Sequence, residues 1–118
     1  MRKNIIKEKR FNFALNIIQL SKDLSNNKKE YVLSKQVLRS GTSIGAMVKE
    51  SEYAESKRDF IHKLSVSLKE ASETMYWLEL LYHSNYMDAD SYIKLKNENE
   101  ELLKILVSIV RKSKENNE

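Results

Sequence analysis

Apolar residues recur at helical spacing along almost the whole chain. The first stripe is Phe13, Ile17, Leu20 and Leu24. Positions three and four apart lie on one face of an α-helix, so this spacing predicts an amphipathic helix that ends at the polar run 25–27. A second apolar stripe lies beside the first and consists of Phe11, Leu15 and Ile18.

Two further helices are expected in the middle of the chain, each with a capping motif at its start. Asn27 and Glu30 have capping-box spacing, and the apolar seam after them predicts a helix that runs to about Glu55. Ser56 and Asp59 repeat the motif before the third helix. The seam of the second helix is Leu33, Val37, Gly41, Ile44 and Val48, and the stripe of the third is Phe60, Leu64, Leu68, Ala71, Met75, Leu78 and Tyr82.

The third helix has a wider apolar face than a bundle interior requires. Val66, Trp77 and Leu81 lie beside its main stripe. We therefore expect this helix to bury one side in its own bundle and part of another side against a second subunit.

A fourth helix follows a loop at residues 83–87, and either Asp88 or Asp90 caps it. Asn99 interrupts its apolar stripe as a polar residue that can set the helix register, as buried Asn does in coiled coils. The stripe is Tyr92, Leu95, Asn99, Leu102, Leu106 and Ile109.

Four helices with short connections predict an all-α fold, an antiparallel up-down four-helix bundle. Residues 1–118 are the size of one domain, and the absence of proline with only two glycines leaves few turn formers for a β-rich fold. Residues 1–10 form either a flexible basic arm or the first turns of the first helix. The polar residues 113–118 are expected to fray.

Both glycines lie inside the second helix, at Gly41 and Gly45. Glycine costs about 1 kcal/mol relative to alanine in a helix interior, so two glycines need a structural reason. Four residues apart, they lie near one face and allow another backbone to approach closely. The alternative is a break at Gly41 that leaves two short helices, but the apolar spacing continues in phase across it.

Cysteine is absent, which excludes disulfides, thiolate metal sites and cysteine catalysis and fits a reducing cytoplasm. No apolar run reaches the roughly 18 residues of a membrane span, and the N-terminus lacks the apolar core of a signal peptide. We therefore expect a cytoplasmic protein.

The formal net charge of +4 comes from the N-terminal segment, because residues 1–10 contain five basic residues and one acidic residue. A second basic group lies at the start of the second helix. Repeated in each subunit of an oligomer, such groups would form a basic ring able to bind phosphates, although an ordinary solvated face explains them equally well. The candidate nucleic-acid-binding residues are Arg2, Lys3, Lys7, Lys9, Arg10, Lys28, Lys29, Lys35 and Arg39.

Glu70 and Glu73 are paired carboxylates one turn apart, and Glu50 could approach them from the second helix. A di-iron bundle needs two Glu-x-x-His pairs, whereas this chain offers only Asp59-x-x-His62, so no metal or cofactor is expected. We expect instead a structural network in which Glu70 meets Lys63, Arg39, Thr74 or Ser43. The residues assigned to structural or interface roles are Gly41, Gly45, Lys63, Glu70, Glu73 and Trp77.

The sequence resembles the four-helix-bundle proteins encoded in intervening sequences of 23S ribosomal RNA genes. The resemblance is carried by YVLSKQ at 31–36, LRSGTSIGA at 38–46, DFIHKL at 59–64 and LKEASETMYWL at 68–78. It is close over residues 11–85, and MVKES at 47–51 departs from the usual family pattern. The resemblance implies a bundle assembled as a homopentamer, with no established enzymatic activity. The chain is similar also to accessory proteins of diversity-generating retroelements, which bind a reverse transcriptase and nucleic acid.

Three classes of function follow, of which we favour non-catalytic binding of nucleic acid, with structured RNA as the expected ligand, by a homo-oligomer. The alternative is a protein-binding scaffold or accessory subunit without a nucleic-acid role. The third is a ribonuclease in which Arg58 and His62, one turn apart, perform general acid–base cleavage, although their spacing departs from known bundle ribonucleases.

Overall fold

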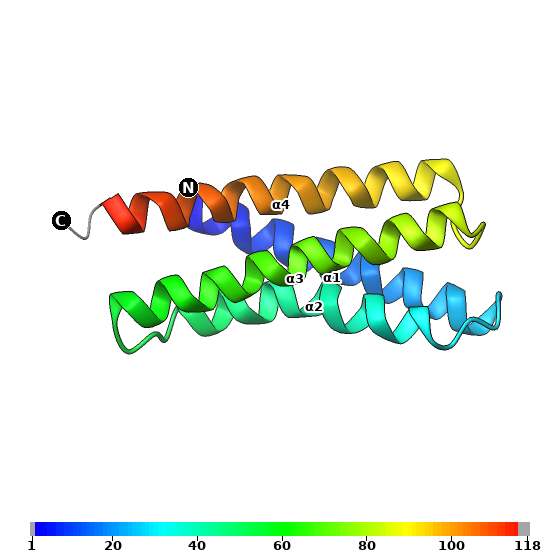
Figure 1. The fold of residues 1–118 in the computed structure, drawn as a ribbon, viewed down its shortest axis with the longest axis horizontal. Coiled ribbons are helices and arrows are strands. Elements are labelled where there is room, and N and C mark those ends of the chain that lie inside the picture. Colours follow the sequence, from blue (N-terminus) through cyan, green and yellow to red (C-terminus); the bar gives the residue numbers. More distant parts are fainter. Residues whose placement is uncertain (1, 116–118) are drawn as a thin grey trace.

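The computed structural model describes residues 2–115, with side chains from Ile5 onward. Its four helices are α1 (Arg2–Asn26), α2 (Leu33–Ser51), α3 (Lys57–His83) and α4 (Ala89–Glu115), and the described residues contain no strand. They pack side by side in an elongated bundle of about 50 × 23 × 21 Å (Figure 1). The predicted all-α four-helix bundle is confirmed.

Contacts between the helices show that neighbouring helices run in opposite directions. Ser40 of α2 contacts Thr74 of α3, whereas Ile44, which comes later in α2, contacts Ser67, which comes earlier in α3. Each remaining neighbouring pair, α1–α2, α3–α4 and α1–α4, packs along the bundle, so the helices occupy its four corners. The colour sequence in Figure 1 follows the same up-down-up-down path.

The main stripes of all four helices meet in one core. Its largest fully buried side chains include Phe13 and Ile17 from α1, Ile44 from α2, Leu78 from α3 and Leu106 from α4. Full burial of a side chain of this size contributes about 1.5–3 kcal/mol, so these five positions are a major source of stability.

The second predicted stripe of the first helix does not join this core. Phe11 is 63% exposed and Leu15 is 45% exposed, whereas Phe13 is 1% exposed. The core side of α1 is already occupied by its first stripe, so the second stripe faces outward beside α2.

The N-terminal segment is helical from Arg2. Ile6 is 6% exposed and belongs to the hydrophobic core. Residues 2–10 are therefore the first turns of α1 and not a flexible arm.

The second helix begins later and ends earlier than the sequence suggests. Asn27 does not cap it: the Asn27 side chain donates to Asp23, and Lys29 adopts a left-handed backbone with φ of 56°. The carboxylate of Glu30 accepts from the Ser34 N–H at 2.8 Å. Glu30 thus caps a helix of 19 residues that runs from Leu33 to Ser51.

The other two predicted caps are present. Ser56 Oγ accepts from the Asp59 N–H at 3.0 Å, while Asp59 reaches back to the N–H of Glu55 at 3.1 Å. Asp88, and not Asp90, caps α4 by accepting from the Ser91 N–H at 2.7 Å. This backbone hydrogen bond is the main cause that lowers the pKa of Asp88.

The two glycines do not break α2, and the nearest atoms that face them belong to side chains of α1 and not to another backbone. A Cβ atom on Gly41 would lie 2.8 Å from Cγ1 and Cγ2 of Ile17, a distance that real Cβ atoms do not reach. A Cβ on Gly45 would lie 3.4 Å from Cβ of Arg10, which is ordinary contact. Gly41 is therefore the position of close approach.

Asn99 is buried, with 1% of its surface exposed. Its side-chain amide donates to the carbonyl of Ala71 at 2.9 Å, which links α4 to α3. No helix within the described residues is long and apolar enough to cross a membrane.

Candidate nucleic-acid interface

Two of the basic residues predicted to bind phosphate instead hold α1 against its neighbours. Arg10 Nη2 lies 3.2 Å from Glu52 Oε2, and only 10% of the Arg10 side chain is exposed. Lys9 Nζ lies 2.9 Å from Glu101 on α4. Each of the two basic residues therefore already has an acidic partner within the chain.

The basic residues of the α1–α2 connection are also engaged. Lys28 Nζ donates to the carbonyl of Tyr86 at 2.8 Å and lies 3.9 Å from Asp23. Lys29 Nζ donates to the carbonyl of Asn26 at 3.0 Å. These contacts tie the α1–α2 loop to itself and to the α3–α4 loop.

Lys7 and Lys35 are exposed, and neither has an ion pair within the described part of the chain. The side chains of Arg2 and Lys3 lie outside the described residues. The structure therefore leaves only Lys7 and Lys35 of the described candidates without an internal partner.

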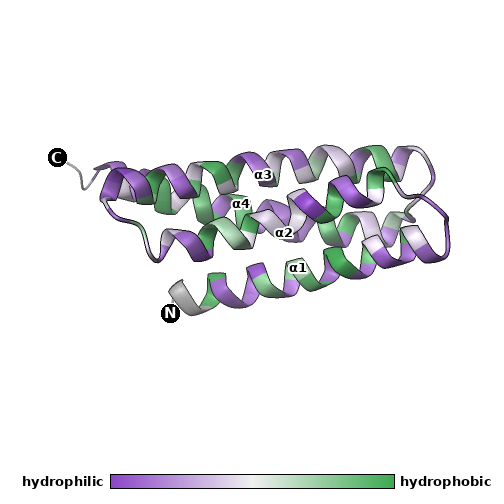
Figure 2. Cartoon of the chain, turned by 90° about the horizontal axis from the view of Figure 1, so that it is seen from below, coloured by the Kyte–Doolittle hydropathy of each residue, from purple (hydrophilic) through white to green (hydrophobic). Residues whose placement is uncertain are grey.

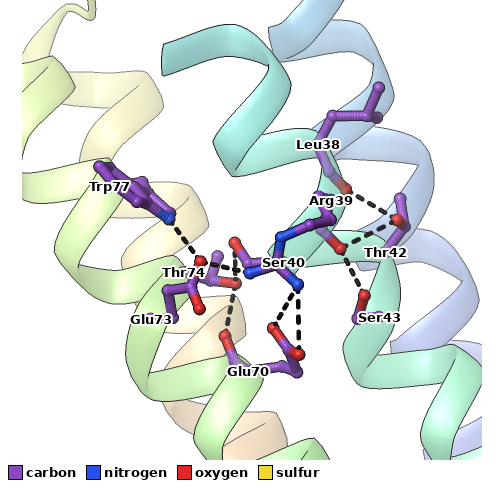
Figure 3. Close-up of polar contacts among 9 residues, drawn as sticks. All are labelled: Leu38, Arg39, Ser40, Thr42, Ser43, Glu70, Glu73, Thr74 and Trp77. Carbon is purple, nitrogen blue, oxygen red and sulfur yellow. Dashed lines mark hydrogen bonds and ion pairs between the residues drawn. The ribbon is translucent and has the colours of Figure 1, made fainter. Parts of the chain in front are cut away.

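Arg39 lies at the centre of an ion-pair network on the outer side of α2 and α3 (Figure 3). Its Nη1 is 3.2 Å from Oε1 of Glu70, and its Nη2 pairs with Glu73. Trp77 Nε1 donates to the same Glu73 oxygen at 2.9 Å. The hydrogen bond from Trp77, together with that from Arg39, lowers the pKa of Glu73.

Of the partners expected for Glu70, the structure selects Arg39 for its carboxylate and Thr74 for its backbone carbonyl. Lys63 is directed elsewhere, with Nζ 3.5 Å from Glu50 and 4.0 Å from Asp59. Lys63 and Glu70 therefore belong to two separate ion-pair groups.

Buried hydroxyl groups join α2 and α3 beneath the Arg39 network. Thr74 Oγ1 lies 2.9 Å from Ser40 Oγ, and Ser67 Oγ donates to the carbonyl of Ile44 at 2.8 Å. Ser40, Ser67 and Thr74 are each 0% exposed. In the sequence, these three are small polar residues at core positions of the helical repeat. A search for apolar stripes alone does not find them.

A second set of basic residues, which the sequence pattern did not single out as a group, meets at one end of the bundle. The end of α4 lies beside the start of α3, near the N-terminus of α1 (Figure 1). The five side chains are all exposed, and none has an ion pair within the described residues; Glu55 and Glu115 are the exposed acids nearby in sequence. We name this set the basic end: Lys57, Arg58, Arg111, Lys112 and Lys114.

The pair considered for ribonuclease chemistry lies on the outside of α3. Arg58 and His62 are exposed, and neither forms a hydrogen bond or ion pair with another described residue. In the described part of the chain, no group of three or more His, Cys, Asp or Glu side chains is arranged to hold a metal ion.

The family model of the 23S rRNA-intervening sequence protein matches residues 2–108. The chain belongs to this family. A comparison with curated proteins finds no match.

A solved structure of the family shares the whole fold. It is a protein of unknown function from the S23 ribosomal protein family of Bacteroides thetaiotaomicron VPI-5482, 50% identical to this chain, with a TM-score of 0.92. The alignment covers 94% of this chain and 99% of that one. The resemblance in the helix motifs is thereby confirmed as family membership.

The family match ends at residue 108, before three residues of the basic end: Arg111, Lys112 and Lys114. This part of the surface is thus described by the chain's own sequence and structure and not by the family model.

Proposed function

We propose that this 23S rRNA-intervening sequence protein is a non-catalytic homo-oligomer that binds structured RNA through its basic end. The observation that carries the proposal is the gathering of five exposed cationic side chains without internal ion pairs, next to a basic N-terminal segment. Phosphate contacts of this kind supply affinity without base specificity. Symmetric assembly would repeat the surface in every subunit.

Support for self-association comes from apolar side chains exposed at the outer edge of α2 and α3. Val32 is 69% exposed, Tyr76 is 56% exposed and Leu80 is 36% exposed. Because α2 and α3 are antiparallel, the start of α2 lies level with the end of α3, which brings Val32 to about the level of Leu80. We propose that the oligomer has five subunits, the number that the family resemblance implies.

The RNA proposal is tested by a gel-shift titration with a structured RNA at low and moderate salt. The logarithm of affinity should fall linearly with the logarithm of salt concentration, by about 0.9 for each phosphate neutralised on a duplex. The variant Arg58→Glu with Lys112→Glu should weaken binding roughly tenfold or more and flatten the salt dependence.

The matched control reverses two exposed lysines away from the basic end, Lys69→Glu with Lys94→Glu, and should weaken binding much less. Equal losses in the two variants, or binding that ignores salt, would refute the basic end as the site. An RNA probe that is cleaved, with cleavage abolished by His62→Ala, would favour the ribonuclease alternative.

Deletion of residues 1–10 is unsuitable for this test. It would remove Ile6 from the core and break the Arg10–Glu52 ion pair, so lost binding would not separate charge from folding. Charge-reversal variants keep the helix and avoid that ambiguity.

A further inference from the structure

A shallow groove follows the outer side of α1 and α2 and is lined by Gly45, one of the two glycines of α2. Its floor consists of small side chains, Ala14 from α1 and Thr42, Gly45 and Ala46 from α2, and its volume is about 630 Å³. Figure 2 shows α1 running along the outside of the bundle beside α2. This groove is distinct from the basic end.

Phe11 lines the groove and begins an apolar row on α1 that is exposed to solvent and continues beyond the groove. Phe11 is 63% exposed and Leu15 is 45% exposed, and partly exposed Ile18 continues the row one turn later. Their i, i+4, i+7 spacing places the three side chains along one line of α1. An exposed apolar row of this length is a common docking surface for the apolar face of another helix.

Exposed lysines frame this row at four points. Lys7 and Lys49 line one end of the groove. Beyond the other end of the groove, the hydroxyl of Ser21 donates to the backbone carbonyl of Ser34, which brings the adjacent positions Lys22 and Lys35 to the same level. None of the four lysines has an ion pair within the described residues, and the groove itself contains one exposed acid, Glu8.

Arg10 adds a buried cationic group that lacks part of its hydrogen bonding. Its side chain lines the groove and is 10% exposed. Nη2 pairs with Glu52, whereas Nη1 is buried without a hydrogen-bond acceptor among the described residues. A buried guanidinium N–H without an acceptor is costly, and an incoming carboxylate is the strongest acceptor for it.

We propose that the α1–α2 groove binds an amphipathic helix of a protein partner, with an apolar stripe that packs on Phe11 and Leu15 and flanking acidic residues that face the four lysines. The stretch between Lys7 and Lys22 is about 22 Å long at 1.5 Å per residue, which matches four turns of a partner helix. This inference does not depend on the proposed binding of RNA.

A second copy of the same chain is a poorer occupant. Pairing two copies of the groove about a twofold axis would place lysines opposite lysines, which is repulsive. The other exposed apolar pair on a long helix, Tyr76 and Leu80, offers a poorer match to four lysines. Of the two acids beside it among the described residues, Glu73 is paired with Arg39 and Glu79 alone has no ion pair, while Lys69 lies on the same face.

The test uses the full chain and two labelled helical peptides of about 18 residues, long enough to span the groove. Both carry leucine at i, i+3, i+4 and i+7; one has glutamate at the flanking positions and the other has lysine. Fluorescence anisotropy should show binding of the glutamate peptide, weakened by salt, and binding of the lysine peptide that is at least roughly tenfold weaker.

Two variants identify the surface. Phe11→Ser with Leu15→Ser should weaken binding of the glutamate peptide roughly tenfold or more, because it removes the apolar row. The matched control, Ile5→Ser with Ile93→Ser, changes apolar residues that are 47% and 52% exposed outside the groove and should leave binding unchanged. Since all four side chains are substantially exposed, both variants should fold.

Charge reversal provides the decisive readout. Lys22→Glu with Lys35→Glu should weaken binding of the glutamate peptide and strengthen binding of the lysine peptide. Equal binding of both peptides, or no effect of the Phe11 and Leu15 substitutions, would overturn the proposal. If those substitutions instead reduced the mass of the protein in solution or abolished the RNA shift, the groove would belong to a second copy or to nucleic acid, and the proposal would also fall.

Discussion

Gly41 and Gly45 occupy equivalent places in the sequence pattern but meet different atoms. Gly41 faces the branched side chain of Ile17, which is 0% exposed and cannot move aside cheaply. Gly45 faces the stem of Arg10, which leaves room for a methyl group. Glycine is therefore required at position 41 despite its low helix propensity, whereas alanine could replace it at position 45.

Replacing Gly41 with alanine should destabilise the protein. Overpacking against Ile17 costs about 1–3 kcal/mol, and the gain in helix propensity offsets about 1 kcal/mol of it. Gly45→Ala should be neutral or stabilising by up to about 1 kcal/mol, because only the propensity gain remains. Urea unfolding of the two variants checks this, and a Gly41→Ala protein as stable as Gly45→Ala would contradict the close-approach argument.

Glu73 should make the stability of the protein depend on pH in the acidic range. Its pKa is lowered in the folded state from the ordinary value of 4.5, so the ionised form stabilises the fold above that value. The contribution should be lost as pH falls through the lowered pKa. Because 35% of the side chain is exposed, it should not exceed about 1 kcal/mol.

The measurement compares urea unfolding of the wild type and Glu73→Gln near neutral pH and well below pH 4.5. The stability difference should be present near neutral pH and shrink in acid. Glu79→Gln, an exposed residue of the same helix without an ion pair in the described part, is the control. A difference for Glu73→Gln that is constant with pH would show that the carboxylate charge does not contribute.

At the scale of the elements, the start of each helix depends on which side chain reaches its free N–H groups. The sequence has two pairs of residues with capping-box spacing, and in each pair one side chain accepts a hydrogen bond from a free N–H at the start of the helix. In α3 the cap is the predicted Ser56, whereas in α2 it is Glu30 in place of Asn27. The left-handed Lys29 lengthens the connection, so Asn27 remains with the end of α1.

Removal of the Ser56 cap should destabilise the bundle measurably. Ser56→Ala leaves the Asp59 N–H without its acceptor and should cost about 1 kcal/mol. Ser72→Ala, an exposed site in the middle of α3, should stay within about 0.5 kcal/mol of the wild type. Thermal unfolding of both variants checks the prediction, and equal midpoints would show that the cap contributes nothing.

At the scale of the whole molecule, we expect the protein to assemble. Light scattering should give a mass well above the monomer value of 13.9 kDa, near five times that value if the family resemblance holds. Val32→Ser with Leu80→Ser should lower the mass, because it removes exposed apolar area at the α2–α3 edge. Ile5→Ser with Ile93→Ser is the control, and a wild-type monomer at micromolar concentration would refute self-assembly.

The sequence by itself determined the helices and most of the core. Helical periodicity is a local property, so stripes such as Phe13–Ile17 and Leu64–Ala71–Leu78 identify their buried faces without knowledge of the partner helix. The continuity of α2 through Gly41 was predictable for the same reason. Family membership followed from the motifs on α2 and α3.

Only the tertiary structure decided which charges remain available and which apolar stripe stays exposed. Lys9 and Arg10 look free in the sequence, but their acidic partners, Glu101 and Glu52, lie on or beside other helices far along the chain. The exposure of Phe11 and the assembly of the basic end likewise depend on the order and rotation of the helices around the core. These are long-range relations, and no local spacing encodes them.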